Sequence, residues 1–167
     1  MKIRRLAGNP IIVPDMDERM GHNVNGPALI RVPDWVASPL GRYYLYFAHH
    51  QGKYIRMAYA DALEGPWTTY QPGKGVLHLN DTRFRNHISS PDGVVDHQSK
   101  QLRMYFHGPA SQAQVDAAGD LLTDFHRTYN QLTTCAVSDY CLSFHEAPGA
   151  KIVGSSYIHA FDWDGYT

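Results

Sequence analysis

Residues 42–49 read RYYLYFAH, and residues 101–108 read QLRMYFHG. Both stretches are rich in aromatic and apolar residues, so each is predicted to be a β-strand. The Tyr46-Phe47 pair of the first stretch recurs as Tyr105-Phe106 in the second. These two stretches decide the fold, because the predicted elements around them also recur in the same order.

Four predicted strands make up each copy of this repeat. The Gln51-Gly52-Lys53 turn joins the second strand to the third, and short connections of this kind favour antiparallel neighbours. Only residues 16–20 and 116–124 indicate short helices, and a third copy starts at residues 155–161. The predicted strands are residues 27–32, 42–49, 54–60 and 67–70 in the first copy, and 90–96, 101–108, 132–139 and 142–144 in the second.

A repeat of roughly 60–70 residues built from four antiparallel strands is typical of a propeller blade. We therefore predict an all-β fold of the β-propeller type, with blade one at residues 24–80, blade two at 87–154 and the start of a third at 155–167. A β-sandwich of about ten strands is the alternative, and the recurring order of elements favours the propeller. Since a ring needs about four to eight blades, we expect this chain to be the N-terminal part of a longer protein.

The composition excludes several classes of protein. Hydrophobic residues make up 43% of the chain and charged residues 19%, unlike a disordered tail or a coiled coil. The net charge is -1 without any block of like charge, so we predict no nucleic-acid partner. The apolar runs are too short for a membrane span or a signal peptide, so we expect a cytoplasmic protein. Cys135 and Cys141 predict neither a disulfide framework nor a nucleophile.

Polar residues gather at one end of the predicted inner strands. In an antiparallel pair, the end of the second strand returns to the face where the first strand began. This places Asn25 and His50 together in the first copy, and His87, Asp92 and His107 together in the second. We predict Asp92 as a catalytic residue and the other four as substrate-binding residues. The long connection at residues 109–130 should border the same face, where specificity is usually determined.

Other roles for these residues stay open. Asp92 can also cap a turn, His49 rather than His50 can face the site, and His107 can be a hydrogen-bonded core residue. We predict no cofactor and no metal site, although His22 could converge with other histidines in three dimensions. The recurring Tyr46 and Tyr105 predict packing between blades.

Several motifs resemble glycoside hydrolase family 43 and its relatives. They are NPII at residues 9–12, NGPALI at 25–30, GRYYLYFA at 41–48, AYADALEGPW at 58–67 and SPD at 90–92. The resemblance implies a five-bladed propeller that acts on arabinans, xylans and related sugars.

The resemblance also implies two carboxylates at the scissile bond, an Asp base just before the first inner-strand Pro and a Glu acid on a later blade. In this sequence Gly26 precedes Pro27, and Asn25 is the nearest polar side chain. Glu64 superficially matches the acid motif, but it precedes the outermost strand of blade one and is interpreted as a turn residue.

Taken together, the leading hypothesis is a glycoside hydrolase acting on O-glycosyl bonds of a poly- or oligosaccharide. The chain itself should lack the later-blade general acid and be inactive alone, and its open propeller edges should favour self-association. The alternatives are a non-catalytic carbohydrate-binding propeller, or an enzyme of this fold that uses His as the acid.

Overall fold

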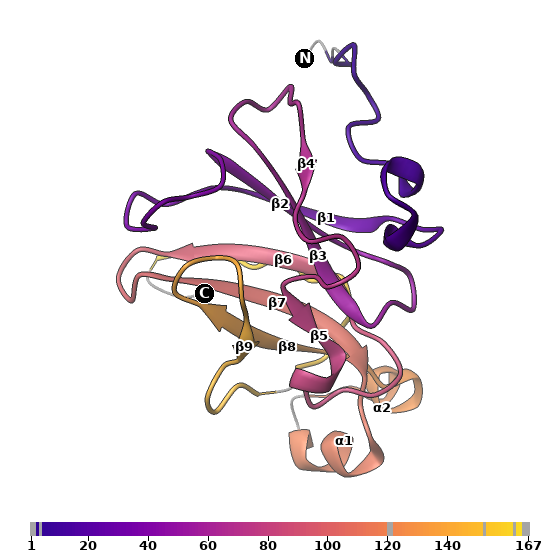
Figure 1. Cartoon of the computed structure of the whole chain (residues 1–167). Coiled ribbons are helices and arrows are strands. Elements are labelled where there is room, and N and C mark those ends of the chain that lie inside the picture. The colour runs from indigo at the N-terminus through magenta and orange to yellow at the C-terminus, as the bar shows by residue number, and fades with distance from the viewer. Residues whose placement is uncertain (1–2, 4, 120–121, 152, 162, 165–167) are drawn as a thin grey trace.

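The computed structural model describes residues 3, 5–119, 122–151, 153–161 and 163–164. Two antiparallel sheets form the molecule and lie one above the other in Figure 1. The first sheet contains β1 (Asn25–Arg31), β2 (Tyr43–Ala48), β3 (Tyr54–Ala60) and β4 (Thr68–Thr69) in that order, and β5 (Leu77–His78) also pairs with β3. The second sheet contains β6 (Ser89–Asp96), β7 (Gln101–Pro109), β8 (Gln131–Ser138) and β9 (His145–Glu146).

The helical elements are short and lie outside the sheets. The predicted helix at 116–124 is wrong in its bounds, because one helix covers residues 112–118 and another covers residues 124–129. Ser111 starts the first of them through a capping box with Gln114, and Gly119 ends it at φ +56°. The helical elements are η1 (Pro14–Met16), η2 (Glu18–Met20), η3 (Leu79–Asp81), α1 (Gln112–Ala118) and α2 (Asp124–Tyr129). No helix within the described residues is long and apolar enough to cross a bilayer.

Strand register confirms the internal repeat. Tyr46 pairs with Ala28 and Met57 in the first sheet, and Tyr105 pairs with Asp92 and Cys135 in the second. With these tyrosines aligned, the edge strands β4 and β9 meet β3 and β8 at equivalent residues. The exits correspond as well, because β5 pairs with β3 just as Val153 bridges to β8.

The predicted strand at 142–144 is wrong, since β9 begins at His145. Cys141 adopts φ +64°, and the Phe144 N–H donates to the Val76 carbonyl of the first repeat instead of to β8. The Phe144 ring is buried edge-on to Tyr46, with ring centroids 5.6 Å apart. Packing between the sheets therefore overrides the local strand signal here.

The main core lies between the two sheets. One face of the first sheet carries Tyr44, Tyr46 and Met57, which pack with Met104 and Phe106 of the second sheet in a single buried cluster. A smaller core covers the other face of the first sheet, and its buried members are Met20, Leu45, Phe47, Ala58, Ala60 and Trp67. Apolar burial on this scale is the main source of the stability of such a fold.

The inner strands β1 and β6 are the edge strands of their sheets, and they pack against each other. Each contains a β-bulge at the same place, between Asn25 and Ala28 in β1 and between Ser89 and Asp92 in β6. Gly26 (φ +57°) and Ser90 (φ +47°) occupy equivalent positions in the bulges. The two bulges touch, because a Cβ on Gly26 would lie 2.6 Å from Ser90 Cα. The starts of the two inner strands therefore lie side by side.

Candidate functional site

The starts of β1 and β6 and the ends of β2 and β7 meet at one end of the molecule. Asn25 pairs with Ala48 in the first sheet, and Ser89 pairs with His107 in the second. The Ser89 hydroxyl donates a hydrogen bond to Asn25 Oδ1 at 3.2 Å, which joins the two strands side chain to side chain. The bulges therefore place polar groups of both sheets at a shared position.

The turn between β2 and β3 brings His50 to the same place. The Gly52 N–H closes this turn on the His49 carbonyl at 2.8 Å, and the Ile88 N–H donates to the Gly52 carbonyl at 3.0 Å. His49 packs against Gly21, where an added Cβ would lie 2.8 Å from its ring. Of the two adjacent histidines, the exposed His50 is therefore the one whose charge acts on the histidines of the second sheet.

His87 and His107 form the centre of the cluster. Their ring centroids are 6.3 Å apart at an angle of 89°. Burial, followed by the charges of His87 and His50, lowers the pKa of His107 to about 4. Burial also lowers the pKa of His87. His107 is therefore neutral near pH 7, and its buried Nδ1 has no hydrogen-bond partner among the described residues.

Asp92 lies beside this cluster on β6 and has both carboxylate oxygens engaged. Oδ1 lies 2.8 Å from His159 Nδ1, and Oδ2 accepts a hydrogen bond from the Ala160 N–H at 2.7 Å. The Asp92 side chain is 13% exposed, whereas that of His159 is 79% exposed. The same segment contacts His107, whose ring centroid is 4.9 Å from that of Tyr157.

The structure thus gathers the predicted residues Asn25, His50, His87 and His107, and residues 157–160 link Asp92 to them. Their roles in binding and catalysis stay predictions. Sequence reasoning also places Ser90 at this end of the second copy, but it missed Ser89, although Ser89 precedes Pro91 by two residues just as Asn25 precedes Pro27. No three His, Cys, Asp or Glu side chains of the described residues are arranged to hold a metal ion.

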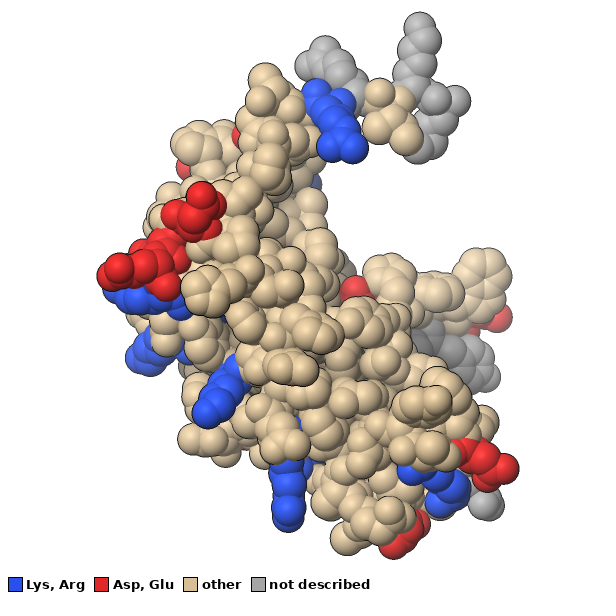
Figure 2. Space-filling view, turned by 90° about the vertical axis from the view of Figure 1, so that its right-hand side faces the viewer, with Lys and Arg blue, Asp and Glu red and all other residues tan. Residues whose placement is uncertain are grey.

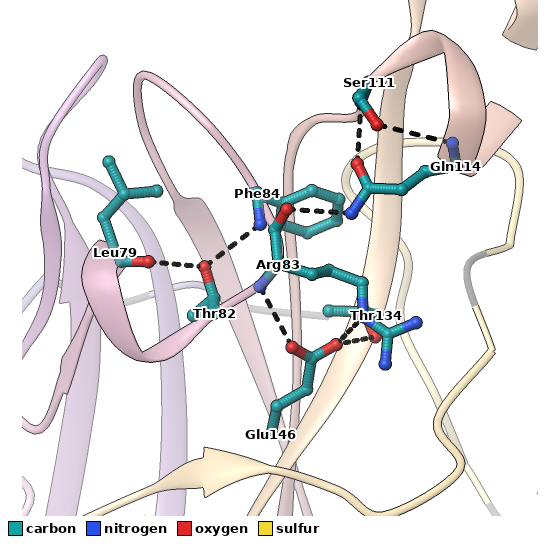
Figure 3. Close-up of polar contacts among 8 residues, drawn as sticks. All are labelled: Leu79, Thr82, Arg83, Phe84, Ser111, Gln114, Thr134 and Glu146. Atoms are coloured by element: carbon teal, nitrogen blue, oxygen red, sulfur yellow. Dashed lines mark hydrogen bonds and ion pairs between the residues drawn. The ribbon is translucent and has the colours of Figure 1, made fainter.

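A polar network fixes the base of the long connection at residues 109–130 (Figure 3). Glu146 accepts hydrogen bonds from the Arg83 N–H at 3.0 Å and from the Thr134 hydroxyl at 3.1 Å, and it pairs with the Arg83 guanidinium. Gln114 of α1 donates to the Arg83 carbonyl at 2.8 Å. The connection is therefore anchored to both β8 and β9, while Phe125 and Tyr129 of α2 are largely exposed.

Each sheet has a cavity on its outer face. An apolar cavity of about 870 Å³ separates the N-terminal segment from Leu45 and Phe47 of the first sheet, and Asn25 reaches its rim. A second cavity of about 620 Å³ lies on the second sheet and is lined in part by Arg103 and Tyr105. Charged side chains are scattered over the face shown in Figure 2 and form no continuous patch there.

Comparison with known proteins supports the fold. No protein-family model matches the chain. The chain is 32% identical over 161 residues to an uncharacterized protein of Acanthamoeba polyphaga mimivirus, covering 86% of this chain and 40% of the viral protein. The chain therefore spans about 40% of the length of this relative.

Solved structures of glycoside hydrolase family 43 share the fold at low sequence identity. A family 43 enzyme of Xanthomonas citri in complex with xylose is 14% identical, with a TM-score of 0.51 over 75% of this chain and 32% of the enzyme. A β-xylosidase/α-arabinofuranosidase from a compost metagenome is also 14% identical, with a TM-score of 0.51 over 75% of this chain and 34% of that enzyme. An exo-β-1,3-galactanase of Clostridium thermocellum is 14% identical, with a TM-score of 0.50 over 77% and 24%.

These likenesses confirm the predicted all-β, propeller-type fold class and the expected similarity to family 43 at the level of fold. The number of blades in the whole protein stays a prediction. The base that the family resemblance implies is absent, because Gly26 occupies its position. A carboxylate cannot be accommodated there in this backbone, since any Cβ would overlap Ser90.

Proposed function

We propose that this chain is the saccharide-recognising, N-terminal part of a glycoside hydrolase-like propeller that acts on O-glycosyl bonds. In this proposal blade one covers residues 24–80, blade two covers 87–154, and a third blade of a five-bladed ring starts at 155–167. Asp92 serves as a carboxylate of the reaction, and later blades supply the general acid. Asn25, His50, His87 and His107 hold the sugar.

One observation carries the proposal: the two bulges bring polar side chains of both sheets to the same end of the inner strands. The Asn25–Ser89 hydrogen bond crosses from one sheet to the other. His107, whose ring is neutral, pairs with Ser89 across strands β6 and β7. Neutral donors and acceptors beside aromatic rings suit a neutral sugar, because each hydroxyl can both donate and accept.

The alternative is a non-catalytic carbohydrate-binding propeller, and Gly26 supports it. Glycoside hydrolysis needs two carboxylates, one to protonate the leaving group and one to activate water or attack. The first-blade carboxylate that the resemblance implies is missing, and the contact with Ser90 excludes its replacement without backbone movement. Hydrolysis therefore depends on whether Asp92 and a later residue can form the pair.

Binding is tested by calorimetric titration of the protein with xylotriose and with β-1,3-galactotriose. Asp92→Ala should weaken binding about tenfold or more, since the lost hydrogen bonds contribute roughly 1 kcal/mol or more. Asp139→Ala is the matched control, because Asp139 accepts from Gln101 in an exposed turn on the second sheet. Equal affinity of wild type and Asp92→Ala, or a larger loss in Asp139→Ala, would contradict the assignment.

Catalysis is tested with aryl-xyloside and aryl-arabinoside substrates. We expect no turnover by this chain alone, and turnover by a longer protein that retains Asp92 if the hydrolase proposal holds. Binding without turnover in the longer protein favours the alternative. We further propose a cytoplasmic location. We also propose self-association through the open propeller edges, which sedimentation of the purified chain would detect.

A further inference from the structure

Arg56 is a buried cation in the first repeat. Its side chain extends from β3, is 1% exposed and lies over the Phe47 ring, with 4.9 Å between the guanidinium carbon and the ring centroid. No carboxylate pairs with Arg56 among the described residues. Burying a charge without a counter-ion costs free energy, so a buried arginine here indicates a need for its hydrogen-bond donors.

The guanidinium of Arg56 donates hydrogen bonds to the backbone carbonyls of two segments. One nitrogen donates to the Met20 carbonyl. The other donates to the Asn23 carbonyl at 2.9 Å and to the Ala48 carbonyl at 2.7 Å. Met20 and Asn23 precede β1, whereas Ala48 ends β2. Arg56 therefore holds residues 20–23 against the end of β2, a contact here called the joint.

Asn23 completes the joint from its exposed side. Its Oδ1 accepts a hydrogen bond from the His50 N–H at 3.0 Å, which ties the turn between β2 and β3 to the same segment. No backbone hydrogen bond of the described structure joins residues 20–24 to residues 48–52. The hydrogen bonds of the joint thus depend on the side chains of Arg56 and Asn23.

The second repeat makes the corresponding contact with its backbone. The Arg85 N–H, in the segment before β6, donates to the Pro109 carbonyl at the end of β7 at 3.2 Å. Gly108 lets this segment come close, since an added Cβ would lie 2.6 Å from the His87 carbonyl oxygen. The first repeat therefore depends on side chains where the second uses its backbone.

We propose that Arg56 and Asn23 are positioning residues that hold Asn25 and His50 in the geometry that the saccharide needs. This inference rests on the proposed function. Asn25 pairs with Ala48, whose carbonyl accepts from Arg56, and the His50 N–H donates directly to Asn23. Loss of either positioning residue should act through Asn25 or His50, while the half of the site that comes from the second sheet keeps its geometry.

The joint is tested first without any sugar, by hydrogen exchange of the backbone amides followed by NMR. Asn23→Ala removes the acceptor of the His50 N–H at an exposed position, so the protein should fold while exchange at His50 rises about tenfold or more. Asn23→Asp keeps an oxygen acceptor and should keep the slow exchange. Arg56→Lys keeps the charge without the planar fork and should also speed exchange at His50.

The amide of Phe106, within the central strand β7, is the internal reference for global stability. Its exchange should be the same in wild type and in Asn23→Ala. Unchanged exchange at His50 in Asn23→Ala, or an equal rise at Phe106, would overturn the proposal.

Positioning is then tested by titrating the same proteins with xylotriose. Asn23→Ala and Arg56→Lys should each bind about tenfold more weakly than wild type, and Asn23→Asp should bind like wild type. His22→Ala is the matched control, because His22 is an exposed neighbour whose side chain makes no hydrogen bond within the described residues. Equal affinity of wild type and Asn23→Ala, or an equal loss in His22→Ala, would overturn the positioning role.

A double-mutant cycle shows whether Asn23 acts through His50. Asn23→Ala/His50→Ala should bind no more weakly than His50→Ala alone, since the positioned side chain is already gone. Additive losses would overturn the positioning role. Absence of xylotriose and β-1,3-galactotriose binding in every protein would overturn the proposed function, and exchange at His50 would then decide the joint by itself.

Discussion

The two bulges are the same piece of backbone carrying different chemistry. In the first sheet the sequence is Asn25-Gly26-Pro27-Ala28, and in the second it is Ser89-Ser90-Pro91-Asp92. Both shift the strand register at the same place and both hold their second residue at positive φ. Residue 26 of the first bulge is a glycine because Ser90 leaves no room for a side chain there. The second bulge presents a carboxylate and two hydroxyls.

The connections after the second strand differ in the same way. The first repeat turns within a few residues between β2 and β3, whereas the second inserts α1 and α2 between β7 and β8. The residue that ends the second strand is Ala48 in one repeat and is matched by His107 in the other. The duplicated scaffold therefore contributes Asn25 and His50 to the site from the first repeat, and a larger set of polar and titratable groups from the second.

The largest effect in this comparison should come from Gly26→Ala. The new Cβ would overlap Ser90 Cα in a backbone region that disfavours side chains, so we expect a loss of about 3 kcal/mol or more in the free energy of unfolding. Gly119→Ala is the matched control, because Gly119 has nearly the same φ but no atom within 4 Å of an added Cβ. Its loss should be smaller, because only the backbone strain remains and no neighbouring atom is displaced. Urea unfolding measures both, and equal losses would mean that contact between the bulges is unimportant.

The second prediction concerns pH and His107. Its pKa is lowered in the folded protein to about 4, from an ordinary value of 6.5. Below pH 6.5 the unfolded chain therefore binds a proton at this histidine more readily than the folded protein does. The stabilisation is complete above about pH 6.5 and is lost as the pH falls towards 4, by up to about 3 kcal/mol. Replacing His107 with alanine, the first-repeat residue, should flatten this part of the stability profile. Parallel profiles for wild type and H107A would show that His107 is not the group responsible.

A smaller effect should distinguish the repeated tyrosines. The Tyr46 hydroxyl is buried and donates to the Cys141 carbonyl at 2.7 Å, which joins the two sheets. Tyr46→Phe should cost about 1–2 kcal/mol, because that carbonyl is left buried without a donor. Tyr105→Phe should cost less than half as much, since Tyr105 lines an open cavity where water can replace the lost contact. Thermal unfolding of both variants gives the comparison, and the reverse order would contradict it.

The smallest effects should come from two acidic residues, Asp17 before β1 and Asp96 at the end of β6. Hydrogen bonding lowers the pKa of Asp17 and of Asp96 to about 2. Asp17 pairs with Arg19 in water, so Asp17→Ala should leave the thermal midpoint unchanged within error. Asp96 accepts from the Gln98 and Ser99 N–H groups in the β6–β7 turn, so Asp96→Ala should lower the midpoint by about 4 °C at most. A large drop for Asp17→Ala would disprove the assumption that water screens its pair.

Much of the candidate site could be predicted from the repeat alone. The alignment of Tyr46 with Tyr105 was enough to place Asn25, His107 and Asp92 near equivalent strand ends, because antiparallel pairing fixes which ends meet. The contact between Ser89 and Asn25 could not be predicted, since it depends on how the two sheets pack. The engagement of Asp92 by residues 159–160 also joins segments far apart in sequence, which no local pattern records.

The sequence by itself determined the strands, their order and their duplication, because alternation of apolar residues and the positions of turns act over a few neighbouring residues. Only the tertiary structure decided that Gly26 lies against Ser90, that Phe144 leaves its expected strand to fill the core, and that residues 159 and 160 engage Asp92. These outcomes depend on packing between segments more than fifty residues apart, where the free energy of burying surface outweighs local preference.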